Sequence, residues 1–414
     1  MQFDLGTVSV LLFVVATAVA IIARRVRLPY TVGLVAAGLI IGSLHLVNAP
    51  HLTPAFLFTL ALPGLVFEAA FNLRAPDLWR NRLALALLAL PGVALAIGIT
   101  TVLLPPALGA IGTRVTLAAG SAFLFASLIS ATDPIAVLAL FRRLGAPHRL
   151  TVLIEAESLL NDATAIAFVV AALAVATHAG TTPLAVGRDF ALSLVGGALI
   201  GLVLGAAAAL GIARIDDPML EITITIIVAY GSFSVAQQLG LSGVLATVAA
   251  GLLCGHRVVR RGMSPSTQLA VNVFWEYLAF ALSSIVFLLI GLEVHFTELV
   301  AVWQPIAAAF LVVLVARAAT VGAAILVVRS THERLPWRWF PVMTWGGLRG
   351  ALSMVLVLGL PTTLPDRPFL IALTFGVVIL SILGQGLSMP WLLDRLGLAH
   401  AESLHADQPL GTDD

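Results

Sequence analysis

Five polar side chains interrupt the start of one long apolar segment, at Glu155, Glu157, Ser158, Asn161 and Asp162. Residues three and four apart lie on the same face of a helix, so the oxygen atoms of Ser158, Asn161 and Asp162 point the same way. A carboxylate, an amide oxygen and a hydroxyl are the hard ligands that a small cation such as Na+ requires. The spacing therefore predicts a monovalent cation site. The alternative, in which Ser158 and Asn161 only join helices through hydrogen bonds, gives no reason for Asp162.

The depth of Asp162 points to transport. If the helix begins at Thr151, a rise of about 1.5 Å per residue places Asp162 roughly 16 Å along it, close to the middle of a bilayer. An ionisable group at that depth is costly unless it is paired or hydrated, so such groups usually mark ion pathways or proton relays. The histidines have no spacing typical of a metal site, and no cofactor is expected.

The composition requires a membrane. The 414 residues are 60% hydrophobic and 10% charged, with a mean hydropathy of +1.06, which is more apolar surface than a water-soluble domain could bury. The apolar runs lack the alternation of β-barrel strands. The run from Thr7 to Ala23 has no basic residue before it and no clear cleavage site, so it is expected to be a retained span and not a signal peptide. The single cysteine, Cys254, excludes an intramolecular disulfide.

These runs predict an all-α polytopic membrane protein with about 13 transmembrane helices. The predicted spans are approximately 7–23, 30–47, 55–71, 83–104, 115–141, 151–175, 189–213, 219–238, 241–255, 272–293, 303–328, 339–360 and 369–393.

Arginine placement predicts the orientation, because short cytoplasmic loops carry the excess of positive charge. The chain has no lysine. The loops on one side hold 17 arginines: Arg24, Arg25, Arg27, Arg74, Arg80, Arg82, Arg142, Arg143, Arg149, Arg214, Arg257, Arg260, Arg261, Arg329, Arg334, Arg338 and Arg395. The opposite loops hold only Arg114, Arg188 and Arg367. This split places the N-terminus outside and the C-terminus in the cytoplasm, in the cell (inner or plasma) membrane.

Two predicted helices are broken near mid-depth. Thr132-Asp133-Pro134 interrupts the fifth span, and residues 346–350, rich in glycine, interrupt the twelfth. An odd number of spans with a lone seventh helix favours two inverted six-helix repeats, in which the discontinuous helices cross at mid-membrane and expose backbone groups to an ion. The alternative is a pair of ordinary kinks, since proline and glycine are frequent in membrane helices.

The remaining buried charges need partners. Glu157 projects partly away from the cation face. We pair it with Arg349, with Arg317 close by, because these two arginines lie in no loop and at matching depth, and arginine stays protonated. Whether this pair is purely structural stays open. Asp133 is expected to cap or complement the ends of the broken helix.

Two further carboxylates are candidates for an entrance on the cytoplasmic side. Glu155 lies nearer to the cytoplasm than the proposed ligands. Glu68, close to the cytoplasmic end of the third span, could equally be an entrance charge or a residue that reaches the membrane interface.

Three motifs together resemble one protein family. They are the run from Glu155 to Asp162, the Thr132-Asp133-Pro134 break, and Trp345-Gly346-Gly347-Leu348-Arg349-Gly350-Ala351. In this order, and on these helices, they resemble the monovalent cation/proton antiporter superfamily, specifically its sodium/proton exchanger branch. The resemblance covers essentially the whole chain.

The resemblance implies a homodimer in which a core domain moves against an interface domain. The interface domain is expected at about 1–82 and 214–300, the core domain at about 83–180 and 301–393, the linking helix at about 185–213, and a short cytoplasmic tail at 394–414. The family's ion site corresponds to Asp162, Asn161, Ser158 and Thr132, and the counterparts of Glu157 and Arg349 pair.

The resemblance also bears on stoichiometry. Electrogenic relatives carry two adjacent aspartates and an intramembrane lysine, whereas this chain has Asn161-Asp162 and no lysine, which implies electroneutral exchange. The tail after Leu393, about 20 residues, is expected to be too short for a regulatory domain.

The expected function is secondary active exchange of Na+ for H+, a transport activity and not an enzymatic one. Asp162 would bind one or the other, and the core domain would cross only when that charge is neutralised. The ligands do not select Na+ over Li+ or K+, so a potassium/proton antiporter is the alternative. Expected partners are monovalent cations, protons and lipid, and no nucleic acid.

Two rivals belong to other classes. An intramembrane aspartyl protease could use Asp133 and Asp162 as a catalytic dyad, but peptide hydrolysis gives the inverted repeat no role. A channel would differ in showing flux that neither saturates nor depends on protons.

Overall fold

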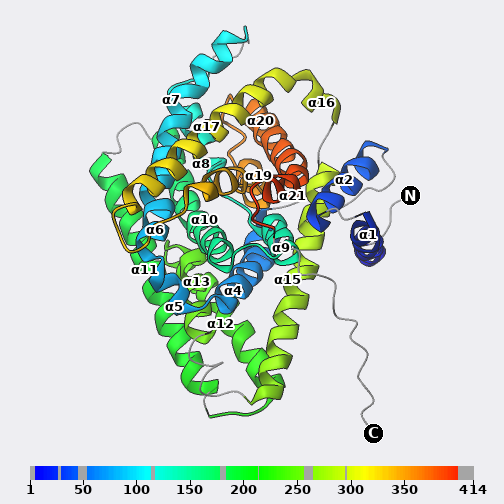
Figure 1. Cartoon of the computed structure of the whole chain (residues 1–414), viewed down its shortest axis with the longest axis vertical. Coiled ribbons are helices and arrows are strands. Elements are labelled where there is room, and N and C mark those ends of the chain that lie inside the picture. The colour runs from blue at the N-terminus through cyan, green and yellow to red at the C-terminus, as the bar shows by residue number, and fades with distance from the viewer. Residues whose placement is uncertain are drawn as a thin grey trace.

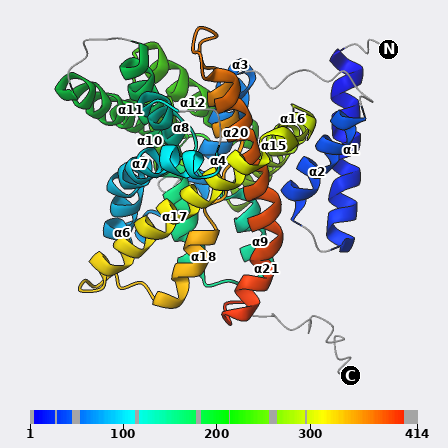
Figure 2. The ribbon, with the colours of Figure 1, turned by 90° about the horizontal axis from the view of Figure 1, so that it is seen from above.

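The structure is a computed structural model that describes residues 5–26, 29–44, 54–112, 117–177, 183–212, 214–255, 264–293 and 296–399. These residues form helices joined by turns and short loops, with no strand among them, which confirms the predicted all-α fold (Figures 1 and 2). Several predicted loop arginines lie outside this part of the chain, namely Arg27, Arg114, Arg257, Arg260 and Arg261, as does the tail from residue 400.

The helices of the first half follow the predicted spans closely. They are α1 (Leu5–Val26), α2 (Tyr30–Ser43), α3 (Pro54–Phe56), the π-helical η1 (Leu57–Ala61), α4 (Leu62–Asn72), α5 (Ala75–Arg80), α6 (Arg82–Leu87), the π-helical η2 (Leu88–Gly92), α7 (Val93–Ala110), α8 (Ala119–Leu128), α9 (Ile135–Leu144), α10 (His148–Thr177) and α11 (Pro183–Ile212).

The second half contains α12 (Pro218–Gln238), α13 (Gly243–Leu253), α15 (Pro265–Glu293), α16 (Phe296–Ala301), α17 (Trp303–Val328), the 3-10 helix η4 (Trp337–Trp339), α18 (Phe340–Trp345), α19 (Ala351–Leu358), α20 (Arg367–Leu380), the π-helical η5 (Ser381–Gln385) and α21 (Gly386–Arg395). The predicted division around Gly240 is correct. That glycine has a φ of 71°, a left-handed conformation suited to ending α12 before α13 begins.

Seven helical stretches in the described ranges are long and apolar enough to cross a membrane, judged by length and composition. Five shorter apolar helices contain 10 to 17 residues each. The chain is therefore a multi-pass membrane protein, while the number of crossings and the orientation stay predictions.

Both predicted breaks are present. The first separates α8, which ends at Leu128, from α9, which begins at Ile135. The second separates α18, ending at Trp345, from α19, beginning at Ala351. Proline at the first break lacks a backbone donor and disfavours helical geometry in the preceding residue, and the glycines of the second weaken the helix, so both breaks follow from residue type.

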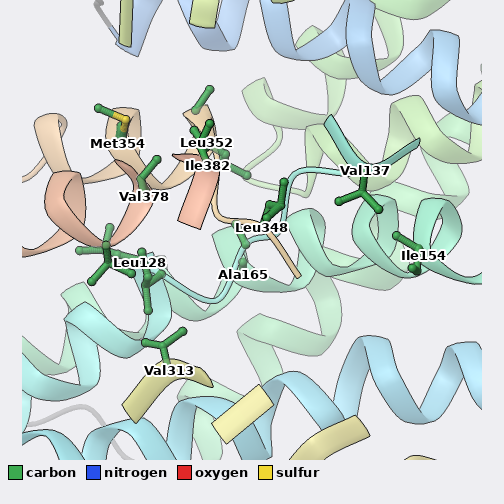
Figure 3. Close-up of a cluster of buried hydrophobic side chains, with 14 of the residues drawn as sticks. Leu128, Val137, Ile154, Ala165, Val313, Leu348, Leu352, Met354, Val378 and Ile382 are labelled. Carbon is green, nitrogen blue, oxygen red and sulfur yellow. The ribbon is translucent and has the colours of Figure 1, made fainter. Parts of the chain in front are cut away.

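An apolar shell surrounds the breaks. Figure 3 shows buried side chains that reach this region from several helices, among them Leu128 of α8, Val137 of α9, Val313 of α17 and Leu352 of α19, together with Leu348 of the second break. Polar groups inside this shell must find partners within the protein or in small internal cavities, because apolar side chains offer none.

Other helices pack against one another around the site. Helix α11 packs on α12 and α13, α13 packs on α4, and α2 packs on α15, while α10 contacts α4, α11 and α13. At Gly201 the α11 backbone approaches α13 so closely that a Cβ atom would collide with the Ala246 carbonyl oxygen. Helices α1 and α2 lie at the opposite edge of the molecule from α11 (Figures 1 and 2). The division into an interface domain, a core domain and a linking helix, and any movement between them, stay predictions.

A network of hydrogen bonds joins the starts of α6 and α10 to the loop before η4. Arg149 donates from Nε to Asn81 Oδ1 at 2.7 Å and from its terminal nitrogens to the Glu333 and Arg334 carbonyl oxygens at 2.9 and 3.0 Å. The Glu333 carboxylate accepts the backbone N–H groups of Leu83 and Ala84 at 3.0 to 3.1 Å, which caps α6.

Candidate ion-binding site

The two helix breaks cross at the centre of the site. The backbone N–H of Asp133 donates to the Leu348 carbonyl oxygen at 2.8 Å, which joins one break to the other. Gly350 lies so close to the Asp133 side chain that a Cβ atom would collide with it. Asp133 Oδ1 accepts the N–H of Ile135 at 3.0 Å and so caps α9, as predicted for this residue. Only glycine permits this approach at position 350.

Thr132, Ser158 and Asn161 form a buried hydrogen-bonded cluster beside the crossing. Thr132 Oγ1 donates to Ser158 Oγ at 3.0 Å, and Asn161 Nδ2 donates to Thr132 Oγ1 at 3.1 Å. The same Nδ2 donates to the Ser130 carbonyl oxygen at 3.0 Å. Asn161 Oδ1 is buried and has no hydrogen-bond partner among the described residues. An acceptor oxygen is therefore free for a cation or a water molecule.

Asp162 lies next to this cluster and is less deeply buried. It lines a cavity of about 100 Å³ together with Thr132, Asp133 and Glu155, while apolar residues of α4 and the start of α19 form other walls. Such a space holds several water molecules. The carboxylates of Asp133 and Glu157 interact electrostatically with Asp162, so a bound cation or proton relieves a local excess of negative charge.

A second and larger cavity, of about 600 Å³, adjoins the first. Its walls include Arg74, Asp77, Arg142 and His148, and Glu155 lines both cavities. The two cavities share Glu155 as a wall residue, and the larger one lies on the side of the arginine-rich loops, because Arg74 and Arg142 line it. The predicted orientation makes that side cytoplasmic.

Glu157 forms a bidentate ion pair with Arg317 of α17. Both contacts, from Nη1 to Oε1 and from Nη2 to Oε2, measure 2.6 Å, and the side chains are 1% and 8% exposed. Arg317 also donates to the Met343 carbonyl oxygen at 3.1 and 3.3 Å, so the pair links α10, α17 and α18 just before the second break. This geometry offsets much of the cost of burying two charges.

Arg349, in the second break, contacts the first. Its Nη1 donates to the carbonyl oxygens of Ser130 and Ala131 at 2.8 and 3.4 Å, and its backbone N–H donates to Ser381 Oγ at 2.9 Å. Carbonyl groups just after a helix end lack partners within the helix. A guanidinium at the C-terminal end of α8 also offsets the negative end of the helix dipole.

Comparison with known proteins identifies the family. The family model described as "Sodium/hydrogen exchanger, transmembrane" matches residues 10–395. This chain belongs to the sodium/hydrogen exchanger family. The exchanger is 36% identical to the Na(+)/H(+) antiporter NhaG of Bacillus atrophaeus, over 97% of this chain and 76% of that protein. It is 33% identical to the Na(+)/H(+) antiporter NhaH of Halobacillus dabanensis, over 94% and 97% of the respective chains.

The fold of the exchanger is similar to a solved structure. The sodium proton antiporter MjNhaP1 from Methanocaldococcus jannaschii, solved at pH 8, superposes with a TM-score of 0.75 over 95% of this chain and 98% of that chain, at 20% identity. This similarity shows the shared fold.

The exchanger brings the predicted ligands together, but one predicted pairing is wrong. Thr132, Ser158 and Asn161 share one cluster, with Asp162 beside it, and their role in ion binding stays a prediction. Glu157 pairs with Arg317 and not with Arg349. The reason is geometric, because α17 presents Arg317 to this face of α10 while Arg349 satisfies carbonyls that the broken α8 exposes.

The two candidate entrance residues differ in position. Glu155 lines both cavities of the exchanger. Glu68, on α4, accepts a hydrogen bond from Asn72 Nδ2 at 2.6 Å, and it is Asn72 that lines the larger cavity. A role for either residue in admitting ions stays a prediction.

Two serines of the exchanger's site were missed from the sequence. The Ser130 carbonyl oxygen accepts from both Asn161 and Arg349, and Ser381 Oγ accepts from the Arg349 backbone while donating to Gln385 Oε1 at 2.7 Å. Ser381 and Gln385 bound the π-helical η5 beside the second break. The spacing of Ser381 and Gln385, four apart on one helical face, could have indicated Ser381, whereas Ser130 acts through its backbone carbonyl and gives no such signal.

Proposed function

We propose that this exchanger moves Na+ and H+ in opposite directions across the cell membrane. The relatives named above are Na(+)/H(+) antiporters, and a family of transporters gives no support to the protease alternative. The observation that carries the proposal is the placement of Asp162. This residue lines a cavity where two broken helices meet, beside a cluster with a free amide oxygen, and this cavity shares Glu155 with a second cavity on the side of the arginine-rich loops.

Competition at Asp162 produces the exchange. A lone carboxylate in this environment is costly, and either Na+ or a proton neutralises it. Asn161 Oδ1, hydroxyl groups and exposed carbonyls supply further oxygens for the metal ion. The core domain crosses between inward-open and outward-open states only with the charge neutralised, so each crossing carries one ion type. A path from the larger cavity past Glu155 to Asp162 corresponds to the inward-open state.

Charge accounting favours electroneutral exchange. Asn161 replaces a possible second carboxylate next to Asp162, and the chain has no lysine. Glu157 and Arg317 neutralise one another, Asp133 caps α9, and we assign the titration that drives exchange to Asp162. The protein works as a homodimer in the plasma membrane, with its N-terminus outside and its C-terminus in the cytoplasm. No resident cofactor takes part.

Transport by Asp162→Asn tests this proposal. Purified protein in proteoliposomes, energised with a pH gradient, is given Na+, and the collapse of the gradient is followed with a pH-sensitive dye. Wild type should dissipate the gradient, and Asp162→Asn should not. Asp189→Asn is the matched control, because this α11 carboxylate is 66% exposed and lies away from the crossing. Exchange retained by Asp162→Asn would refute the assignment. Adding Li+ or K+ in place of Na+ shows whether the wild-type protein also exchanges these cations for protons.

A further inference from the structure

Glu155 occupies the junction between the inner and the outer cavity. It lies seven residues before Asp162, with Leu159 between them, and all three line the inner cavity. Positions four and seven apart form one stripe along a helix, so the two carboxylates are about 10 Å apart along the axis of α10. Any cation that travels from the outer cavity to Asp162 along α10 passes Glu155.

Arg142 provides a cation that is already present at this junction. Its Nη2 lies 3.8 Å from Glu155 Oε1, and its side chain is 63% exposed whereas that of Glu155 is 12% exposed. This single long contact contrasts with the paired 2.6 Å contacts between Glu157 and Arg317. An exposed guanidinium held by one such contact can move into water at little cost, while the carboxylate stays at the junction.

Among the described residues, Arg142 is the nearest charged partner of the Glu155 carboxylate, and His148 also interacts with it electrostatically. Glu68, on the facing helix α4, interacts electrostatically with both Glu155 and Arg142 and adds negative charge at the junction. Arg142 sits near the end of α9, the half-helix that begins just after Thr132 and Asp133, so the cation at the junction belongs to the element that also borders the ion site.

We propose that Arg142 and the incoming metal cation compete for Glu155, so that this pair sets the apparent affinity for Na+ from the cytoplasmic side. The proposal rests on the exchange function proposed above. With Arg142 in place, Glu155 is neutralised and the positive guanidinium repels cations that approach Asp162. When Na+ arrives, it displaces the guanidinium, binds at Glu155 and moves along the stripe to Asp162. Arg142 and Glu155 are positioning residues and take no part in the exchange at Asp162 itself.

The proposal predicts that these variants change the KM for Na+ at the cytoplasmic face only. An exposed ion pair contributes little free energy, so removing Arg142 should lower the KM for Na+ at the cytoplasmic face by up to about fivefold. Glu155→Gln should raise the same KM, and Glu155→Asp should restore much of it. The maximal rate should stay unchanged in Arg142→Gln, and the KM for Na+ at the outer face should stay unchanged in every variant.

Everted and right-side-out membrane vesicles test this proposal, because they present opposite faces to added Na+. The variants are Arg142→Gln, Glu155→Gln and the double variant, with Arg143→Gln as the matched control. Arg143 is the next residue of α9, is exposed and is not among the residues lining either cavity. In everted vesicles Arg142→Gln should lower the KM and Arg143→Gln should not. In the Glu155→Gln background, Arg142→Gln should have no effect.

Other outcomes are decisive too. An unchanged KM in Arg142→Gln, an equal change at both faces, or the same change in Arg143→Gln would overturn the competition, even with normal wild-type exchange. Wild-type vesicles without Na+-dependent proton flux would instead refute the exchange function itself. If Glu155→Gln does not reach the membrane, Glu155→Ala with and without Arg142→Gln supplies the same charge-free background, and Glu155→Asp should keep the effect of Arg142→Gln.

Discussion

Breaking the Glu157–Arg317 ion pair from one side should destabilise the exchanger more than removing both partners. In Arg317→Met, the Glu157 carboxylate remains 1% exposed and loses two donors at 2.6 Å, and an uncompensated buried charge of this kind costs about 3–5 kcal/mol. Glu157→Met leaves Arg317 charged and buried, and in the part of the chain that the structure describes the Met343 carbonyl oxygen is then its one remaining acceptor. The double variant buries no charge and removes the donors only from the Met343 carbonyl oxygen, which should lower the free energy of unfolding by about 1–3 kcal/mol.

Thermal melting of purified protein in detergent measures this ranking. Wild type should melt at the highest temperature, the double variant next, and both single variants lowest. Asp189→Asn is the control, because it breaks an ion pair whose partners are 70% and 66% exposed and should change stability by less than about 1 kcal/mol. Single variants as stable as wild type, or a double variant less stable than both, would refute the reasoning. Normal melting combined with lost transport would place the pair within the exchange mechanism.

Two further predictions concern the backbone. Gly350→Ala should slow exchange and lower the melting temperature, because the new Cβ atom collides with the Asp133 side chain. Gly98→Ala is the control, since a Cβ atom at this position of α7 meets no neighbour and should change neither quantity. Normal exchange by Gly350→Ala would show that the two breaks are packed less tightly than described. Glu333→Ala should cost about 1–2 kcal/mol in the same melting assay, since two backbone N–H groups of α6 lose their acceptor, and an unchanged melting temperature would contradict the capping role.

The face of α10 that bears Ser158 and Asn161 could be predicted because helical spacing alone determines which side chains point together. The two breaks could be predicted for a similarly local reason, since proline and clustered glycines act on their own backbone. The crossing of these breaks needed only the further rule that inverted repeats bring their discontinuous helices together.

The partner of Glu157 could not be predicted in the same way. Sequence gives the depth of Arg317 and Arg349 in the membrane, but it does not give the direction in which each helix presents its side chain. The competing acceptors for Arg349 are the Ser130 and Ala131 carbonyl oxygens, which become available only because α8 ends there. The π-helical turn at Ser381 likewise depends on packing against the second break, which no local pattern specifies.

The most direct test of the central claim measures proton release when Na+ binds. Purified exchanger in weakly buffered detergent solution is titrated with Na+ over a range of pH, and released protons are counted with an indicator dye. At acidic pH, where the proton must leave before Na+ binds, each bound Na+ should release a proton, and the apparent Na+ affinity should fall about tenfold for each unit of decrease in pH. Asp162→Asn should release none. Na+ binding without proton release at every pH, or release retained by Asp162→Asn, would contradict competition at this carboxylate.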